Sequence, residues 1–237
     1  MILNYKFFLP ISLVVLYTIG ILSLGQWTKK MDYVVSNNLY INSQFNFQIG
    51  LLVITFISLL TTYFLHKENF AQYFSLGNIN AIGQELKIFG IAKGDSWMKT
   101  GLSLSVLISI VTGVFMYFQL KNHMVDYSIL KPAILWILLF SLTNSFAEEM
   151  IFRLGIVSPL SGLLSPIHIC FISAILFGLP HFAGMPSGII GATMAGVLGF
   201  VLTKSMLETS GFFWAWFIHF LQDIIIIGSL YLINTKL

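Results

Sequence analysis

Two adjacent glutamates and a nearby arginine lie inside an apolar stretch of this chain. The residues are Glu148, Glu149 and Arg153, in the run Ala-Glu-Glu-Met-Ile-Phe-Arg. A charged side chain near the centre of a bilayer costs a few kcal/mol or more, so three such residues need partners or a function. Glu149 and Arg153 are four apart and can pair on one helix face, whereas Glu148 is turned by about 100°. One glutamate can therefore be held by the arginine while the other faces a cavity.

Two histidines follow later in the chain, each with a partner four residues away. His181 comes four residues after Phe177, and Pro180 between them breaks the helical hydrogen-bond ladder and can kink the helix. His219 and Asp223 share one helix face and can hydrogen-bond to each other. Ionisable residues inside membrane segments are functional candidates by default, and these can satisfy one another. The combination predicts a polar site within the membrane.

The residue types in this site favour hydrolysis by an activated water. A carboxylate in a partly dry cavity becomes a better proton acceptor near neutral pH. Two imidazoles can orient water, polarise a carbonyl group or donate to a developing oxyanion. The spacing places no serine or cysteine beside these histidines, and the single cysteine, Cys170, has apolar neighbours that suggest a buried thiol. We therefore expect amide hydrolysis inside or at the edge of the membrane rather than a covalent acyl-enzyme.

The composition requires a membrane to hold these residues. Of 237 residues, 57% are hydrophobic and only 9% are charged, and the mean hydropathy is +0.88. A soluble domain carries about 25% charged residues. The net charge of +3 comes from basic residues in the loops, which we interpret as topology signals rather than as a nucleic-acid surface. The predicted fold class is an all-α, polytopic transmembrane helix bundle of about seven or eight helices.

A hydrocarbon core about 30 Å thick needs about 20 mostly apolar helical residues. The hydropathy pattern predicts seven spans, over residues 7–27, 46–65, 101–119, 132–155, 166–182, 187–204 and 211–233. The less hydrophobic stretch 68–92 could hide an eighth helix but is more typical of an interfacial helix. The chain thus divides into N-terminal helices with a polar loop, 1–125, and a core of later helices, 130–235.

The basic residues predict an orientation, although the asymmetry between the two sides is small. The longest polar segment, near 66–100, should face the cytoplasm together with the N-terminus, because it carries Lys67, Lys87, Lys93 and Lys99. The opposite loops carry Lys29, Lys30, Lys121 and Lys131.

The sixth span carries small residues spaced by four, which allow close packing of helix backbones. We expect that packing to occur within one chain rather than in a homodimer, and the oligomeric state stays open. The two series are Gly188, Ala192, Gly196 and Gly191, Ala195, Gly199.

Taken together, the polar elements resemble the motifs of the CPBP intramembrane proteases, the group that includes the CAAX prenyl endopeptidase Rce1 and the bacterial Abi proteins. That pattern has two glutamates with an arginine four residues after the second, then phenylalanine and histidine four apart, then histidine and asparagine four apart. The matching residues here are Glu148, Glu149, Arg153, Phe177, His181, His219 and Asp223. Order and separations agree over about residues 130–235.

The resemblance implies a helix bundle with a cavity open to the cytosol and a role for each residue. Glu148 would be the general base, and His181 would help it hold the water. His219 would help form the oxyanion site, while Glu149 and Arg153 would stabilise the catalytic helix. No cofactor or metal is implied. The partners expected are membrane lipid and a membrane-associated peptide or protein, without nucleic acid, and a bacterial cell membrane is the expected location.

Asp223 departs from the family pattern, in which asparagine is usual at this position. An ionised aspartate cannot donate a hydrogen bond to an oxyanion. Either Asp223 stays protonated in its apolar surroundings, or it orients His219 and leaves the donor role to that histidine; we prefer the second reading. A second difficulty is geometric, because straight helices over 132–155 and 166–182 would place Glu148 and His181 about 15 Å apart in depth.

Three alternatives stay open at the level of sequence. A zinc protease could use glutamate, His181 and His219 as ligands, because three such ligands and a water make a catalytic zinc site. The chain lacks a His-Glu-x-x-His element, which favours the metal-independent reading. A non-hydrolytic immunity or regulatory scaffold could keep the same fold, and a proton-coupled transporter could use the same carboxylates as relays.

Overall fold

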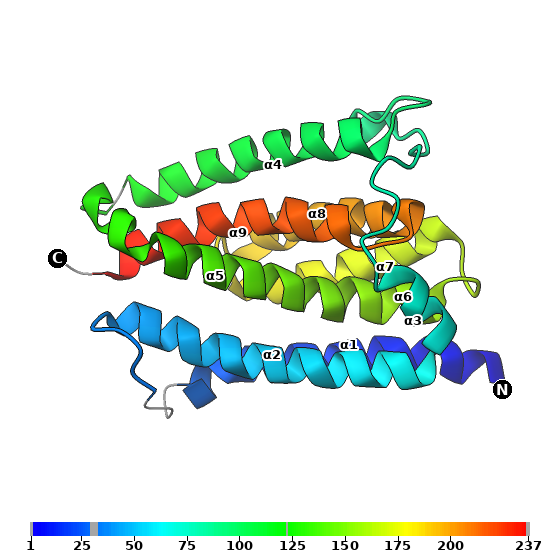
Figure 1. Ribbon diagram of the computed structural model, residues 1–237, viewed down its shortest axis with the longest axis horizontal. Helices are drawn as coiled ribbons and strands as arrows, with labels where there is room; N and C mark the ends of the chain where they lie inside the picture. Colours follow the sequence, from blue (N-terminus) through cyan, green and yellow to red (C-terminus); the bar gives the residue numbers. More distant parts are fainter. Residues whose placement is uncertain (1, 29–32, 122, 236–237) are drawn as a thin grey trace.

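The computed structural model describes residues 2–28, 33–121 and 123–235, and over these ranges it is an all-helical bundle (Figure 1). The predicted fold class is confirmed. The helices are α1 (Ile2–Trp27), α2 (Leu39–Leu65), α3 (Lys67–Tyr73), α4 (Trp97–Leu120), α5 (Leu130–Glu148), α6 (Gly155–Leu160), α7 (Pro166–Gly178), α8 (Gly188–Thr209) and α9 (Phe213–Asn234). A π-helical segment, Glu149–Leu154, joins α5 to α6, and a 3₁₀ turn, Leu179–Ala183, extends α7.

Seven stretches within the described ranges are long and apolar enough to cross a membrane. Each corresponds to one of the predicted spans, and the second and the fourth extend furthest beyond the predicted bounds. The second begins at Leu39, and the fourth runs continuously from Tyr127 to Leu160. The protein is therefore an integral membrane protein.

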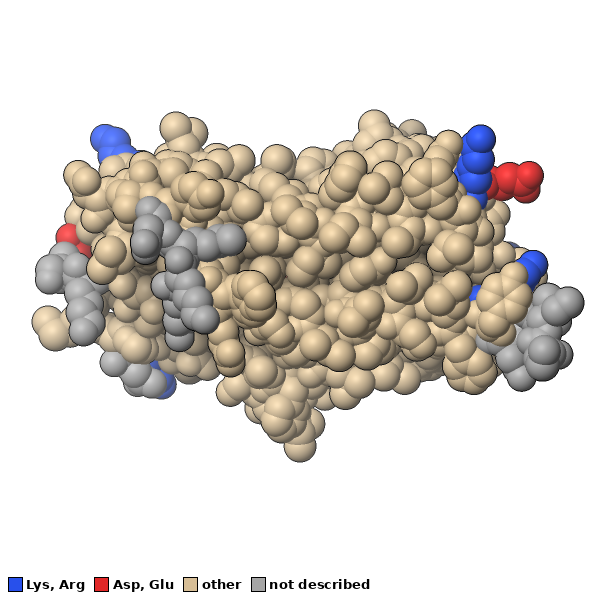
Figure 2. All heavy atoms as spheres, turned by 90° about the horizontal axis from the view of Figure 1, so that it is seen from below, with Lys and Arg blue, Asp and Glu red and all other residues tan. Residues whose placement is uncertain are grey.

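The surface agrees with this assignment. Figure 2 shows one face on which lysine and acidic side chains lie toward the two ends, with a wide zone between them that carries none. The N-terminal end of α1 and the loop before α4 lie toward one end of the bundle, and the C-terminal end of α9 lies at the other (Figure 1). This arrangement agrees with the prediction that the N-terminus and this loop face the same side of the membrane. Lys29 and Lys30, used to predict orientation, lie outside the described residues.

The polar segment between α2 and α4 is mostly not helical, so the interfacial helix predicted over 68–92 was wrong beyond α3. The segment is held in place by hydrogen bonds to α8 and α9. The side chain of Glu208 accepts from the backbone N–H of Gln84 at 3.2 Å and from Nε1 of Trp97, the first residue of α4, at 2.8 Å. The indole of Trp214 donates to the carbonyl oxygen of Ile79 at 3.0 Å. This segment thereby closes one end of the bundle.

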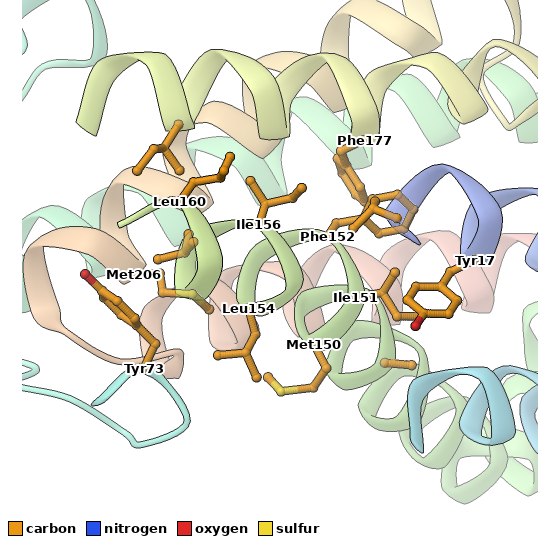
Figure 3. Close-up of a cluster of buried hydrophobic side chains, with 14 of the residues drawn as sticks. Tyr17, Tyr73, Met150, Ile151, Phe152, Leu154, Ile156, Leu160, Phe177 and Met206 are labelled. Carbon is orange, nitrogen blue, oxygen red and sulfur yellow. The ribbon is translucent and has the colours of Figure 1, made fainter. Parts of the chain in front are cut away.

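The core of the bundle surrounds the π-helical segment and α6. Every residue from Glu149 to Leu160 is buried, so this stretch has no face toward lipid. Its apolar side chains pack against Tyr17 of α1, Tyr73 of α3, Phe177 of α7 and Met206 of α8 (Figure 3). A helix that is hydrophobic on all sides belongs in the centre of a bundle, and here that helix also carries two charged residues.

Close contact between α7 and α8 confirms the packing predicted from the small residues of the sixth span. A methyl group added to Gly178 would lie 2.6 Å from the carbonyl oxygen of Ala192. One added to Gly199 would lie 3.3 Å from Cβ of Phe177. Small residues let helix backbones approach this closely in a membrane protein. The contact holds the end of α7, including Phe177 and the turn that carries His181, against its neighbour.

Candidate active site

Three membrane spans bring the predicted site residues to one place in the bundle. The end of α5 and the π-helical segment carry Glu148, Glu149 and Arg153. The end of α7 and its 3₁₀ turn carry Phe177 and His181, while α9 carries His219 and Asp223.

Glu149 and Arg153 form a fully buried ion pair. Arg153 Nε lies 3.2 Å from Glu149 Oε2, and neither side chain has any exposed surface. The guanidinium carbon also lies 3.8 Å from the centre of the Phe177 ring, a cation–π geometry. The guanidinium nitrogens have no hydrogen-bond partner among the described residues, so this charge is balanced by the carboxylate and the ring face. The pairing expected from the i, i+4 spacing is present.

The other oxygen of Glu149 orients His219. The distance from His219 Nδ1 to Glu149 Oε1 is 2.7 Å, and both groups are buried. The carboxylate can only accept, so Nδ1 carries the hydrogen and Nε2 faces the rest of the site. Nε2 then lies 3.6 Å from Glu148 Oε2 and 3.7 Å from Asp223 Oδ1. Glu149 therefore makes two contacts, one with Arg153 and one with the histidine.

The predicted hydrogen bond between His219 and Asp223 is not formed. At 3.7 Å their nearest nitrogen and oxygen are beyond hydrogen-bonding distance, although an ionic contact remains. Asp223 Oδ2 instead accepts from Asn144 Nδ2 at 3.1 Å. The residue that orients His219 is Glu149, on the neighbouring span, so the preferred reading of Asp223 as the orienting group was wrong.

Glu148 is the most accessible of the three carboxylates. Its side chain keeps 17% of its surface exposed, against 0% for Glu149 and 7% for Asp223. Glu148 Oε1 accepts a hydrogen bond from Asn144 Nδ2 at 3.2 Å. Glu148 Oε2 is buried near His219 and has no hydrogen-bond partner among the described residues. Asn144 thus holds one oxygen of Glu148, and the other lies beside His219 without a hydrogen bond.

His181 lies in the 3₁₀ turn, where its own helix orients it. Nδ1 is 2.7 Å from the carbonyl oxygen of Phe177, which can only accept, so Nδ1 carries the hydrogen and Nε2 is left free of that bond. The centre of the Phe177 ring lies 4.6 Å from that of His181 and 5.7 Å from that of His219. Phe177 therefore packs against both imidazoles.

The predicted gap in depth between Glu148 and His181 disappears because the fourth span is longer than expected. The span continues through the π-helical segment and α6 to Leu160, and α7 starts back at Pro166. At about 1.5 Å per residue, Glu148 and His181 each lie about 20 Å from the connection between α6 and α7, residues 161–165, and therefore at a similar depth. The α-helix of the fifth span also ends at Gly178, and Pro180 falls in the 3₁₀ turn, as its missing N–H favours.

Two polar residues of the site were missed by sequence reasoning. Asn144 stands one turn before Glu148 and contacts two carboxylates, and Gln48 of α2 donates to Asn144 Oδ1 from 3.5 Å. Asn144 could have been found by the same four-residue spacing that identified the other pairs. Gln48 lies in a different span, far from the motifs, and only the folded chain brings it close.

Neither a metal cluster nor a described cavity coincides with these side chains. Within 2–28, 33–121 and 123–235, no group of three or more His, Cys, Asp or Glu residues is arranged to hold a metal ion. An open groove of about 330 Å³ lies between α4 and α9, and a cavity of about 10 Å³ lies among α1, α2 and α6. The water-filled pocket expected around Glu148 therefore stays a prediction.

The comparisons with known proteins agree with the motifs. Residues 130–225 match the family model described as type II CAAX prenyl endopeptidase Rce1-like. That match is consistent with the CPBP family and includes all seven predicted site residues. No curated protein and no solved structure matches the chain.

Proposed function

We propose that this protein is an intramembrane endopeptidase in which Glu148 activates the water that hydrolyses a peptide bond. The match of residues 130–225 to a membrane protease family supports the class of enzyme. The observation that carries the role of Glu148 is its oxygen Oε2, which lies 3.6 Å from His219 Nε2 and has no hydrogen-bond partner among the described residues. Glu149 is occupied by Arg153 and His219, which suits it to positioning.

The proposed reaction begins with a water between Glu148 and His181. Glu148 takes a proton from this water as the oxygen bonds to the carbonyl carbon of the substrate, and the carbonyl oxygen becomes an oxyanion. His219, protonated on both ring nitrogens beside the carboxylates of Glu148, Glu149 and Asp223, donates from Nε2 to that oxyanion. When the C–N bond breaks, the proton passes from Glu148 to the departing amine nitrogen. His181 holds the water through the ring nitrogen that does not bond to Phe177.

Glu149, Arg153 and Phe177 support this reaction without touching the substrate. Glu149 fixes the His219 ring, Arg153 balances the charge of Glu149, and Phe177 covers the guanidinium and packs against the two histidines. In this proposal the segment 130–235 is the catalytic core and 1–125 supports it. Asp223 adds a second acceptor beside His219 Nε2.

The proposed substrate is a membrane-associated peptide of leader type, or one tethered by a lipid. The matching family is described as a CAAX prenyl endopeptidase, so peptides with a prenylated cysteine near the C-terminus belong in the first set of test substrates. We further propose that the N-terminus faces the cytoplasm of a bacterial cell, which would present the site to substrates made on that side.

The test is cleavage of a peptide panel by the purified protein in detergent and in vesicles. The panel holds leader-type peptides and prenylated peptides, and the enzymes are wild type, Glu148→Gln and His181→Ala. We expect cleavage of at least one peptide by wild type, loss of cleavage in Glu148→Gln, and strong loss in His181→Ala. Equal cleavage by all three would show that the site is wrongly assigned. Inhibition by a chelator with recovery on adding zinc would favour the zinc reading instead.

A further inference from the structure

The side chain of Asn144 lies between two carboxylates of the site and bonds to both. One nitrogen, Nδ2, donates to Glu148 Oε1 at 3.2 Å and to Asp223 Oδ2 at 3.1 Å. An amide nitrogen has two hydrogens, so both bonds can form at the same time. Two like charges at close range repel each other, and a donor shared between them offsets that repulsion. The bond to Asp223 also joins α5 to α9.

The carboxylates and Gln48 of α2 favour the same orientation of the Asn144 amide. Ionised carboxylates only accept, so Nδ2 of Asn144 must face them and Oδ1 must face away. There Oδ1 accepts from Gln48 Nε2 at 3.5 Å, and Gln48 Oε1 accepts from the hydroxyl of Thr143 at 2.8 Å. Gln48 is 4% exposed. The chain of donors therefore runs in one direction, from Thr143 through Gln48 and Asn144 to Glu148.

This orientation has a consequence for the free oxygen of Glu148. With Oε1 bonded to Asn144, the carboxylate plane is fixed, and Oε2 is turned toward His219 Nε2, 3.6 Å away. A general base must present its oxygen to the water within a few tenths of an ångström of the productive position. Without the bond from Asn144, the side chain of Glu148 would sample several rotamers.

We propose that Asn144, oriented by Gln48, is a positioning residue that fixes Glu148 for catalysis and keeps it apart from Asp223. The inference rests on the proposed function of Glu148. It also assigns a role to α2, which lies outside the segment that matches the protease family. Asn144 is not a catalytic residue in this proposal, because it acts through Glu148.

The experiment compares three variants of this chain with a matched control. Asn144→Leu removes both donated bonds, Asn144→Asp keeps the shape but can only accept, and Gln48→Met removes the orienting donor. The control is Thr112→Val, which removes the 2.6 Å bond from Thr112 to Gln222, another hydrogen bond between two spans. Steady-state cleavage of the best peptide gives kcat and KM separately, and unfolding in detergent gives the stability of each protein.

Both Asn144 variants should lower kcat about 100-fold and leave KM within about threefold, because a misplacement of about 1 Å costs that much. Gln48→Met should lower kcat about 10-fold by the same reasoning. Thr112→Val should keep kcat within about twofold of wild type, because the lost bond to Gln222 contributes to stability and touches none of the proposed site residues. If Asn144→Asp keeps wild-type kcat, or if Gln48→Met and Thr112→Val lose activity in proportion to stability, the positioning role is refuted.

A second measurement needs no cleavage and so separates this inference from the proposed function. The infrared difference between wild type and Glu148→Gln isolates the carboxylate bands of Glu148. Asn144→Leu should shift these bands, because Oε1 loses its donor, whereas Thr112→Val should leave them unchanged. Unshifted bands in Asn144→Leu would overturn the inference even if no substrate is found. Wild type that cleaves nothing, with bands that do shift, would reject the proposed function and retain the contact.

Discussion

Removing the charge of Arg153 should destabilise the protein strongly, because this is the one arginine of the chain and it balances a buried carboxylate. In Arg153→Met, Glu149 would stay fully buried with only the bond to His219. Two unit charges 3.2 Å apart attract by about 5 kcal/mol at an effective dielectric constant near 20. Breaking a buried ion pair by removing one partner costs about 3–5 kcal/mol. We therefore expect Arg153→Met to lose about 3–5 kcal/mol of the free energy of unfolding.

A double-mutant cycle isolates the part of this loss that comes from the pair. Glu149→Gln leaves Arg153 unbalanced and should also destabilise, whereas the double variant Arg153→Met with Glu149→Gln leaves no buried charge at this position. We expect the double variant to be at least about 2 kcal/mol more stable than Arg153→Met alone. The assay is reversible unfolding in mixed micelles at increasing denaturing detergent, followed by circular dichroism.

The matched control for this cycle is Lys99→Met. Lys99 pairs with Asp95 at the same four-residue spacing, but the lysine is 67% exposed. Exposed pairs contribute little, so this variant should unfold at the wild-type midpoint. A loss in Arg153→Met no larger than in Lys99→Met, or a double variant no more stable than the single one, would refute the reasoning.

Two further predictions concern the packing around the site. Phe177 is 1% exposed and contacts the Arg153 guanidinium, so Phe177→Ala should cost about 3–5 kcal/mol of unfolding free energy in the same detergent titration. The variant should also lose cleavage at temperatures where the protein stays folded. Gly101→Ala should cost about 1–3 kcal/mol of unfolding free energy, because its methyl group would overlap the buried Trp214 ring. Gly113→Ala, on the same helix with no atom within 4 Å of the added methyl group, should be neutral or stabilising, and equal unfolding midpoints for the two variants would contradict this.

The spans could be predicted from sequence because lipid requires long apolar helices, and hydropathy records that requirement locally. Boundaries could not, since polar residues near helix ends are tolerated when they are capped or buried. Asn38, for example, caps α2 by accepting from the Ile41 amide, which moves the start of this helix to Leu39. The fourth span was cut short because its last residues, through Pro159 to Leu160, include small and polar side chains.

The pairing of Glu149 with Arg153 could be predicted because it depends on spacing along one helix. The partner of His219 could not, because Glu149 reaches it from another span. The spacing rule also assumed a regular α-helix, whereas Glu149–Leu154 is π-helical, a feature often found at functional sites. Gln48 shows the same limit, since only packing between α2 and α5 brings it to Asn144.

Single-turnover cleavage in vesicles by wild type and Glu148→Gln decides whether Glu148 removes the proton from the hydrolytic water. Glutamine keeps the size of the side chain and an oxygen for the bond from Asn144, but it cannot accept a proton as a base. We expect the rate of bond cleavage to fall by about 10²–10⁴-fold with substrate binding unchanged. A Glu148→Gln protein that cleaves the same peptide within a few fold of the wild-type rate would contradict the proposed mechanism.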